Sequence, residues 1–454
     1  MKIRQLWQHV RSSLWFVPGL SVLVAVGLAI MLIEVDGHLE GQLLERWPRL
    51  FGSGAAGARG LLATVASSMI TVVGVVFSIT IVALSLASSQ YTSRVLRNFM
   101  RDRSNQTVLG VFVSIFAYCL VVLRTIRGGD EGAFVPALAV LFGLILAFVG
   151  IAVLIYFIHH IATSIQAAHI LAAAADETLR AVDHLFPDGV GDDDDDAQPG
   201  PPGLGQVWHA VPSIATGYLQ SLDTAGLLAF ASKHQTVVRM ERGIGQFVIQ
   251  GTPLVSVLRT PVTEDVKREI DSLCAIGRQR TVEQDAAFGV RQIVDIALRA
   301  LSPGINDTTT AVMCIDYLTA ILVRLTARRI ESRYRSKDGE LRLLTCGPTY
   351  AGMVGESFDQ IRQNAGGNVA ILDGLLGSAE LLGSCASPSR RRVLIEHVKA
   401  VAELAGRTIP APTERERVEE RSSRILESLN AGKAPNGLVH KHGRFPDEAG
   451  SLPA

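Results

Sequence analysis

The sequence is short of cysteine, of charged residues and of any excess charge of one sign. Five cysteines in 454 residues cannot build the disulfide framework of a small secreted domain. Lysine plus arginine number 43 and aspartate plus glutamate number 43, so no bulk positive charge is present to hold a nucleic acid. Charged residues make up 19% of the chain, below the ~25% usual for soluble domains, which indicates long apolar segments. We therefore expect no nucleic-acid partner.

The motifs of common catalytic and cofactor sites are also absent. The chain has no Walker loop, dinucleotide-binding glycine loop, His-Glu-x-x-His, paired Cys-x-x-Cys or Gly-x-Ser-x-Gly elbow. We therefore expect no cofactor and no metal, and we predict no enzymatic activity. The cysteines lack paired spacing, which fits a reducing compartment. They are Cys119, Cys274, Cys314, Cys346 and Cys385.

Four apolar segments fill the first third of the chain, and they predict four transmembrane helices. Their limits are residues 14–33, 60–87, 105–125 and 134–158. A bilayer core of ~30 Å needs ~20 helical residues, and a helix satisfies its backbone groups internally. No clean cleavage site follows the first segment, so we interpret it as a retained helix rather than a signal peptide. Residues 1–160 are the expected transmembrane domain.

A dense basic cluster between the second and third segments indicates the orientation. Arg94, Arg97, Arg101 and Arg103 are accompanied by a single acid, Asp102. Because loops rich in arginine stay in the cytoplasm, we expect this loop on the cytoplasmic side. With four spans, both chain termini are then cytoplasmic, and the protein is a multi-pass protein of the inner (plasma) membrane.

The second apolar segment carries a face of small and hydroxylated residues. They recur every seven residues in two parallel rows: Thr64, Thr71, Ser78 and Ser85, and Ser67 and Gly74. Small residues permit close helix approach, so one interpretation is a helix–helix interface. The other is a pore, a hydrated pathway lined by hydroxyl groups. The sequence alone leaves both open.

Beyond the membrane segments we expect a cytoplasmic α+β domain. A helical extension at 161–187 leads to an acidic Pro/Gly linker at 188–206, the α+β domain at 207–430 and a disordered tail at 431–454. The Gly243–Leu258 stretch resembles the small β hairpin or half-barrel of biotinyl and lipoyl domains, without their acceptor lysine. A strand is expected at 341–345. Helices are expected at 218–234, 263–273, 293–301, 308–325, 350–364, 368–384, 389–406 and 413–429.

The most polar stretch, residues 277–307, holds the candidate ligand-binding residues. They are Arg278, Arg280, Gln284, Asp285, Arg291, Asn306 and Asp307. One interpretation is a structural network of ion pairs and helix caps. A second is a recognition site for an anionic ligand such as a phosphate, because the arginine fork binds two oxygens at once. A third is a hydrolytic site on Asp285 and Asp307, although no histidine or nucleophile accompanies them at useful spacing.

The same stretch resembles a bacterial family of integral membrane proteins, domain of unknown function 2254. The elements that carry the resemblance are Arg280-Thr281, Gln284-Asp285, Phe288-Gly289 and the run from Ser302 to Asp307. The four-helix front end and Phe358-Asp359-Gln360-Ile361-Arg362 also match, so the resemblance covers roughly residues 10–405. Where the family continues with proline, this chain has Thr308, which weakens that helix start slightly. The resemblance implies the membrane topology and brings no catalytic residues.

Two functions fit these features. The first is an oligomeric channel or transport-related protein in the lipid bilayer, with the cytoplasmic domain as its regulator. The alternative is a non-conducting membrane sensor or scaffold that binds a small anionic ligand through residues 277–307. Both include a homo-oligomer as the expected assembly.

Overall fold

A computed structural model describes residues 16–38, 54–90, 103–127, 134–164, 166–186, 206–330 and 332–432. Almost all of the expected linker, the tail beyond residue 432, and Arg94, Arg97 and Arg101 lie outside the described residues. The chain divides into two compact units, Met1–Ile170 and Leu171–Ala454.

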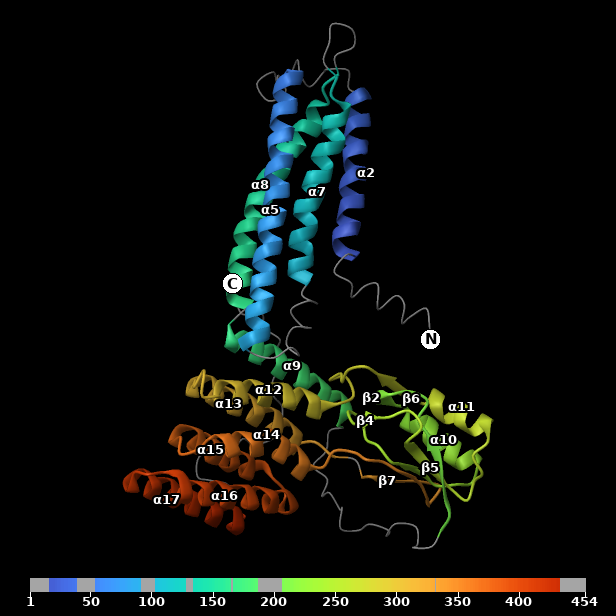
Figure 1. Cartoon of the computed structure of the whole chain (residues 1–454), viewed down its shortest axis with the longest axis vertical. Helices are drawn as coiled ribbons and strands as arrows, with labels where there is room; N and C mark the ends of the chain where they lie inside the picture. Colours follow the sequence, from blue (N-terminus) through green and yellow to red (C-terminus); the bar gives the residue numbers. More distant parts are fainter. Residues whose placement is uncertain are drawn as a thin grey trace. The chain divides into compact units, whose positions relative to one another are not determined.

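Long helices build the first unit. Within the described residues they are α2 (Phe16–His38), α5 (Ala55–Gln90), α7 (Arg103–Thr125) and α8 (Ala137–Ser164) (Figure 1). Each of the four expected segments is helical, although α5 extends beyond the predicted limits at both ends, and α2 and α8 do so at their C-terminal ends. Helix α7, like α8, packs against the other three helices. Its buried apolar residues recur in steps of three and four, the spacing of one helix face: Val108, Phe112, Ile115, Cys119 and Val122.

Two glycines of α8 allow this close packing. A Cβ atom added at Gly143 would lie 2.8 Å from the Leu62 side chain of α5, and one at Gly150 would lie 3.1 Å from Met69 Sδ. The glycines are seven residues apart and therefore share a helix face. Helix α8 is also fixed at its start, where the Asp36 carboxylate accepts bonds from the first backbone N–H groups.

By length and composition, five of the described helices could cross a membrane. Four are the helices of the first unit, and the fifth is α13 (Thr308–Thr326) of the second unit. The least apolar of the five is α13. The mixed α/β character expected for the C-terminal part is confirmed in the second unit.

A separate helix, α9 (Ala167–Leu185), begins the second unit's packing. The sequence predicts one helical extension over residues 161–187, but α8 ends at Ser164 and α9 starts anew at Ala167. Leu171, Thr178 and Val182 on one face of α9 are completely buried. This amphipathic face explains why the helix folds back onto the unit rather than standing free.

Two β-sheets share one apolar core in the second unit. The five-stranded sheet has the order β1-β5-β3-β8-β7 and the three-stranded sheet the order β4-β2-β6. The strands are β1 (Trp208–Pro212), β2 (Gly217–Leu222), β3 (Val238–Met240), β4 (Phe247–Val248), β5 (Pro253–Leu258), β6 (Cys274–Gly277), β7 (Tyr334–Lys337) and β8 (Glu340–Leu344). The expected hairpin is therefore one piece of a larger β structure, to which both sheets contribute core residues.

The predicted helix at 218–234 is wrong in its first part. Residues Gly217–Leu222 form β2, and α10 (Thr224–Lys233) starts only after Asp223, whose side chain accepts the Gly226 N–H. Leu219 is buried in the core between two strands that come later in the sequence. Partners that distant leave no local signal.

The remaining helices form a stack of pairs (Figure 1). They are α11 (Glu264–Ser272) beside the sheets, then α12 (Ala286–Ala300) with α13, α14 (Tyr350–Asn364) with α15 (Val369–Cys385), and α16 (Pro388–Thr408) with α17 (Pro412–Ala431). All were expected from apolar periodicity, and the observed bounds agree to within a few residues except for α12, which starts seven residues earlier. Asp285 explains that early start, since its side chain caps the helix.

Candidate functional site

The small and hydroxylated face of α5 points away from the other helices of its own unit. Thr64, Ser67, Thr71, Gly74, Ser78 and Ser85 are all exposed. The opposite face of α5 is the buried one, and it consists of Ala58, Leu62, Ala66, Met69, Val76 and Ala83. Among the described helices of its own unit, α5 therefore forms no interface through the hydroxyl face. Either pairing with another molecule or a pathway at an assembly axis is compatible with this placement.

Several hydroxyls of α5 are satisfied within the helix. Thr64 donates to the Gly60 carbonyl at 2.8 Å, Ser68 to Thr64 at 2.8 Å and Thr71 to Ser67 at 2.9 Å. Such bonds let hydroxyl residues sit in an apolar environment without water. The face can thus contact lipid, protein or water without leaving these groups unpaired.

The candidate ligand-binding residues are spread along α12. Arg280, Gln284 and Asp285 precede its first turn, whereas Asn306 and Asp307 follow its last. A helix of 15 residues is about 22 Å long at ~1.5 Å per residue. Asp285 and Asp307 therefore lie at opposite ends of the helix and are not brought together as a carboxylate pair.

At the first end, Arg280 and Asp285 form a shielded ion pair. Arg280 Nη2 lies 2.8 Å from Asp285 Oδ2, and the side chains are 25% and 6% exposed. The other oxygen of Asp285 accepts the Phe288 N–H, and the Arg280 guanidinium covers the Phe288 ring at 5.0 Å. Burial raises the pKa of Asp285 above its usual value, against the opposing effect of Arg280. A buried pair of this kind stabilises local structure only while both partners are present.

Gly245 lies directly against the Arg280–Asp285 ion pair. Gly245 has a φ of +81°, and a Cβ atom there would collide with the Asp285 carboxylate. The loop before β4 thus rests directly on the ion pair because it has no side chain at this position. Gln284 adds a second connection to the sheets, as its Oε1 accepts the N–H of Leu222 in β2. Arg278, one residue after β6, is exposed.

The other candidate residues fix neighbouring helices. Arg291 pairs with Asp295 at 2.8 Å on α12 and reaches Glu356 of α14 at 3.5 Å. Asp307 caps α13 by accepting both the N–H and the hydroxyl of Thr310. These bonds to Thr310 lower the pKa of Asp307.

The residue before this cap, Asn306, has a φ of +48°, a backbone conformation that asparagine tolerates better than most residues. Together with the contacts of Arg280 and Arg291, the geometry is that of ion pairs and helix caps. A ligand role for the seven candidate residues remains a proposal.

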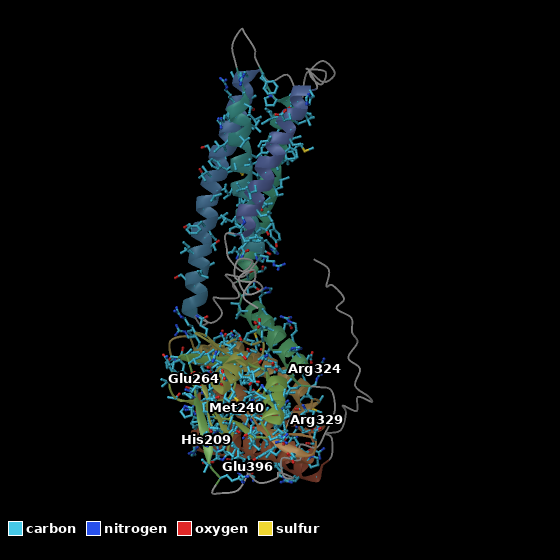
Figure 2. The ribbon with its side chains drawn as sticks, turned by 90° about the vertical axis from the view of Figure 1, so that its right-hand side faces the viewer. His209, Met240, Glu264, Arg324, Arg329 and Glu396 are labelled. Carbon is cyan, nitrogen blue, oxygen red and sulfur yellow. The ribbon has the colours of Figure 1, made fainter. Side chains whose placement is uncertain are left out.

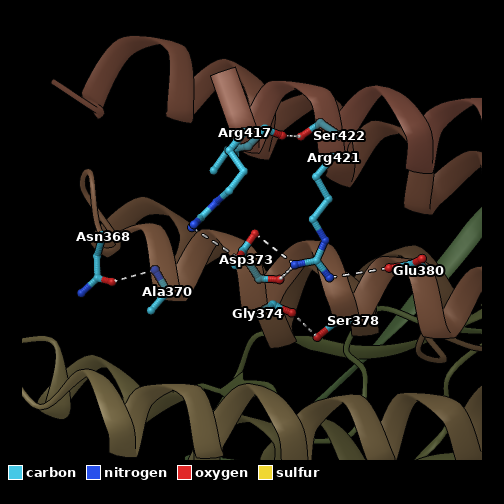
Figure 3. A network of polar contacts seen from close by, with 10 residues as sticks. Asn368, Ala370, Asp373, Gly374, Ser378, Glu380, Arg417, Arg421 and Ser422 are labelled. Carbon is cyan, nitrogen blue, oxygen red and sulfur yellow. Dashed lines mark hydrogen bonds and ion pairs between the residues drawn. The ribbon is translucent and has the colours of Figure 1, made fainter. Parts of the chain in front are cut away.

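Further ion pairs hold the helices of the second unit together. Asp183 of α9 pairs at 2.7 Å with Arg324 of α13 and at 2.6 Å with Arg328, two residues after that helix ends, and these arginines lower the pKa of Asp183. Arg324 is labelled in Figure 2. Between α15 and α17, Arg421 joins Asp373 at 3.0 Å and Glu380 at 3.6 Å (Figure 3). These pairs connect helices far apart in the sequence, so sequence spacing does not reveal them.

Among the buried polar residues of the described chain, the sequence analysis does not single out Arg390, His397 or Asn105. Arg390 of α16 donates to the carbonyls of Thr326 and Arg328 and so caps the end of α13. His397 is buried beside the Phe358 ring, 5.2 Å between centroids. Asn105 is buried in α7. Asn105 could have been found, because it continues the three-and-four spacing of the buried face of α7.

No group of three or more histidine, cysteine, aspartate or glutamate side chains lies close enough to hold a metal ion within the described residues.

Comparison with known proteins gives a family and no activity. The family model described as "Predicted membrane protein (DUF2254)" matches residues 11–380. Three relatives are each 34% identical over 430 residues, which cover 92% of this chain and 81% of theirs. They are the uncharacterized proteins MT1328 and Rv1290c of Mycobacterium tuberculosis and Mb1321c of Mycobacterium bovis. No solved structure matches the chain.

Proposed function

Because this chain belongs to the DUF2254 family of predicted membrane proteins, we propose that it works in the bilayer as an oligomeric channel or transport-related protein. Its second unit acts as a regulatory domain in the cytoplasm. Three observations support parts of this proposal, and the first carries it.

The outward hydroxyl face of α5 carries the proposal. Its six positions extend over Thr64–Ser85, about 32 Å of helix at ~1.5 Å per residue, which is close to the thickness of a bilayer core. A lone copy would leave this face to lipid, although large apolar residues suit lipid better. A second copy would use the small residues for close approach, and a ring of copies would place the hydroxyls around an axis.

Four spans rather than five are favoured by the neighbours of α13. It packs against α12, α14 and α15, and Ile315, Leu318 and Leu322 are completely buried among them. It also carries Asp316 and Arg324. An apolar helix whose face is covered inside a mixed α/β unit has no need of lipid.

With four spans, residues before α2 and after α8 lie on one side of the membrane. The arginine-rich loop between α5 and α7 lies on that same side, and Arg103 at the start of α7 belongs to it. The positive-inside bias therefore supports a cytoplasmic second unit and spans in the inner membrane.

The alternative function is a non-conducting sensor or scaffold for an anionic ligand at residues 277–307. Arg278 favours it, because this side chain is exposed at the end of β6. Arg280 and Arg291 count against it, since carboxylates of the same unit already neutralise them. We therefore rank it second.

The test combines assembly and flux. In a variant without native cysteines, Ser78→Cys should cross-link between copies in nanodiscs, whereas Val76→Cys on the buried face of α5 should not. Native mass spectrometry should show three or more copies. In liposomes, Ser78→Leu should reduce ion flux, while Phe77→Leu, on an exposed position outside the hydroxyl rows, should not. A monomer, or equal flux in both variants, contradicts a conducting oligomer.

A further inference from the structure

Asn105 is a buried carboxamide without a partner in the membrane unit. The residue is 9% exposed. Neither its amide nitrogen nor its amide oxygen has a hydrogen-bond partner in the part of the chain that the structure describes, and both atoms are shielded from solvent. It lies in the first turn of α7, three residues before Val108 on the buried face of that helix. Buried polar groups in native proteins are paired with protein, water or a ligand, so this side chain requires an occupant.

The position of Asn105 favours an anion as that occupant. The first N–H groups of a helix have no acceptor within the helix, and the N-terminal end of the helix dipole is positive. Side chains in a helix lean toward its N-terminus, so the Asn105 carboxamide leans toward the first-turn N–H groups, which have no acceptor within α7. Amide and backbone N–H groups together form a set of donors, which suits a negatively charged ligand.

The described charges near this turn agree with this assignment. Arg103, a cation, is the first residue of α7. The carboxylates of the first unit that the structure describes, Glu34 and Asp36, are on α2. Asp36 binds the start of α8, and the Asn105 end of α7 lies at the other end of α8.

Polar side chains near the C-terminal end of α8 lie beside the first turn of α7. Tyr156 donates to Ser104 Oγ at 3.4 Å, and its ring stacks on His160 with 5.7 Å between centroids. His160 in turn contacts the buried Ser164 hydroxyl at 3.4 Å. These hydroxyl and imidazole groups lie near the end of α8 that contacts the start of α7. Because Asn105 is only 9% exposed, a small ion suits this position better than a bulky headgroup.

We propose that the first turn of α7 binds a small monovalent inorganic anion of the halide class, held by the Asn105 amide and the backbone N–H groups. The Asn105 oxygen then pairs with a water that accompanies the ion. This site does not depend on conduction, so it stands or falls separately from the proposed channel.

The experiment measures thermal unfolding of the full chain in nanodiscs of zwitterionic lipid. Sodium chloride is titrated against sodium gluconate at constant ionic strength. The wild type should show a saturable rise in unfolding temperature with chloride, as expected for a ligand that binds only the folded state. Asn105→Leu should weaken the apparent chloride affinity at least tenfold. Thr125→Val, which removes a hydroxyl that bonds to the Val122 carbonyl at the far end of the same helix, should leave the chloride affinity unchanged.

A second variant covers the case in which Asn105→Leu does not fold. Arg103→Gln changes an exposed side chain and should weaken chloride binding severalfold without loss of fold. Equal unfolding temperatures of the wild type in chloride and gluconate would overturn the proposal. So would a dependence on the cation instead of the anion, or chloride affinity that is unchanged in both variants.

Discussion

Gly289 of α12 lies so close to Thr178 of α9 that a Cβ atom added at Gly289 would collide with the threonine side chain. Thr178 is completely buried, and its hydroxyl donates to the Ala174 carbonyl at 2.7 Å. The threonine cannot turn away without losing that bond and disturbing its neighbours. The packing of α9 on the second unit therefore depends on the missing side chain at Gly289.

Replacing Gly289 with alanine should destabilise the protein even though alanine is the better helix former. Alanine gains about 1 kcal/mol of helix propensity over glycine, but overpacking a filled core costs about 1–3 kcal/mol. We expect a net loss of about 1–2 kcal/mol in the free energy of unfolding, measured by urea denaturation of the full chain. Adding Thr178→Ala should recover part of the loss. Gly304→Ala, where a Cβ atom meets open space, should have little effect, and an equal loss there would refute the packing argument.

The Arg280–Asp285 pair should respond unequally to removal of its two members. Arg280→Met leaves the Asp285 carboxylate, 6% exposed, without its cation, and we expect a loss of about 3 kcal/mol. Asp285→Asn keeps a good helix cap and leaves Arg280, which is a quarter exposed, able to reach water. We expect Asp285→Asn to lower the free energy of unfolding by only about 1 kcal/mol. Urea denaturation of both variants at neutral pH measures the difference, and equal losses would contradict it.

The penalty of Arg280→Met should also depend on pH. Without the cation, burial raises the pKa of Asp285 still further above its usual value of 3.8. The folded state then holds its proton at a pH where the unfolded chain has released it, so stability falls as pH rises through this window. The penalty should therefore be smallest near pH 4 and largest at neutral pH. A penalty that grows on acidification would show that another group is responsible.

His397 should make the second unit sensitive to acid. Burial lowers the pKa of His397 from 6.5 to about 4, with Asp359 opposing and Arg362 supporting this shift. Between these two values the unfolded chain binds a proton that the folded chain excludes, so stability falls as pH falls from about 6.5 to about 4. The loss amounts to roughly 3 kcal/mol at ~1.4 kcal/mol per pKa unit.

Unfolding curves between pH 7 and 4 measure this loss. His397→Leu should flatten the profile in this range, because it removes the group that titrates. His169→Gln, which changes an exposed histidine of α9, is the matched control and should keep the wild-type slope. An unchanged slope in His397→Leu would assign the acid sensitivity to other groups.

The sequence predicts the helices well because their signals are local. Apolar spacing and the cap Thr349 place α14 at Tyr350–Asn364, the limits expected from the sequence. The prediction of a helix at the residues of β2 is wrong because the partners of this strand, β4 and β6, come later in the chain. Propensity over a short window cannot detect pairing of that kind.

The candidate sites were harder to predict for a different reason. A seven-residue repeat shows that Thr64, Thr71 and Ser78 share a face of α5, but it does not say what covers that face. The buried row that includes Ala66 and Ala83 is also made partly of small residues. Likewise, Asp285 and Asp307 belong to one polar stretch of the sequence and are 22 positions apart. In the structure they lie at opposite ends of α12. Patterning identifies faces, and packing partners decide their roles.

Two glycines of the membrane unit should separate folding from assembly. Gly143 faces Leu62 at a distance that leaves no room for a side chain, whereas Gly74 on the outward face of α5 has no atom of the described chain within 4 Å of an added Cβ. Gly143→Val should therefore lower the unfolding temperature in detergent, because it forces α8 away from α5. Gly74→Val should leave the unfolding temperature of the single chain unchanged.

If copies meet through the hydroxyl face of α5, Gly74→Val should instead weaken self-association about tenfold or more, measured by native mass spectrometry across a dilution series. Unaltered association of Gly74→Val would place the contact between copies on another face, and the outward hydroxyls would then be left to lipid.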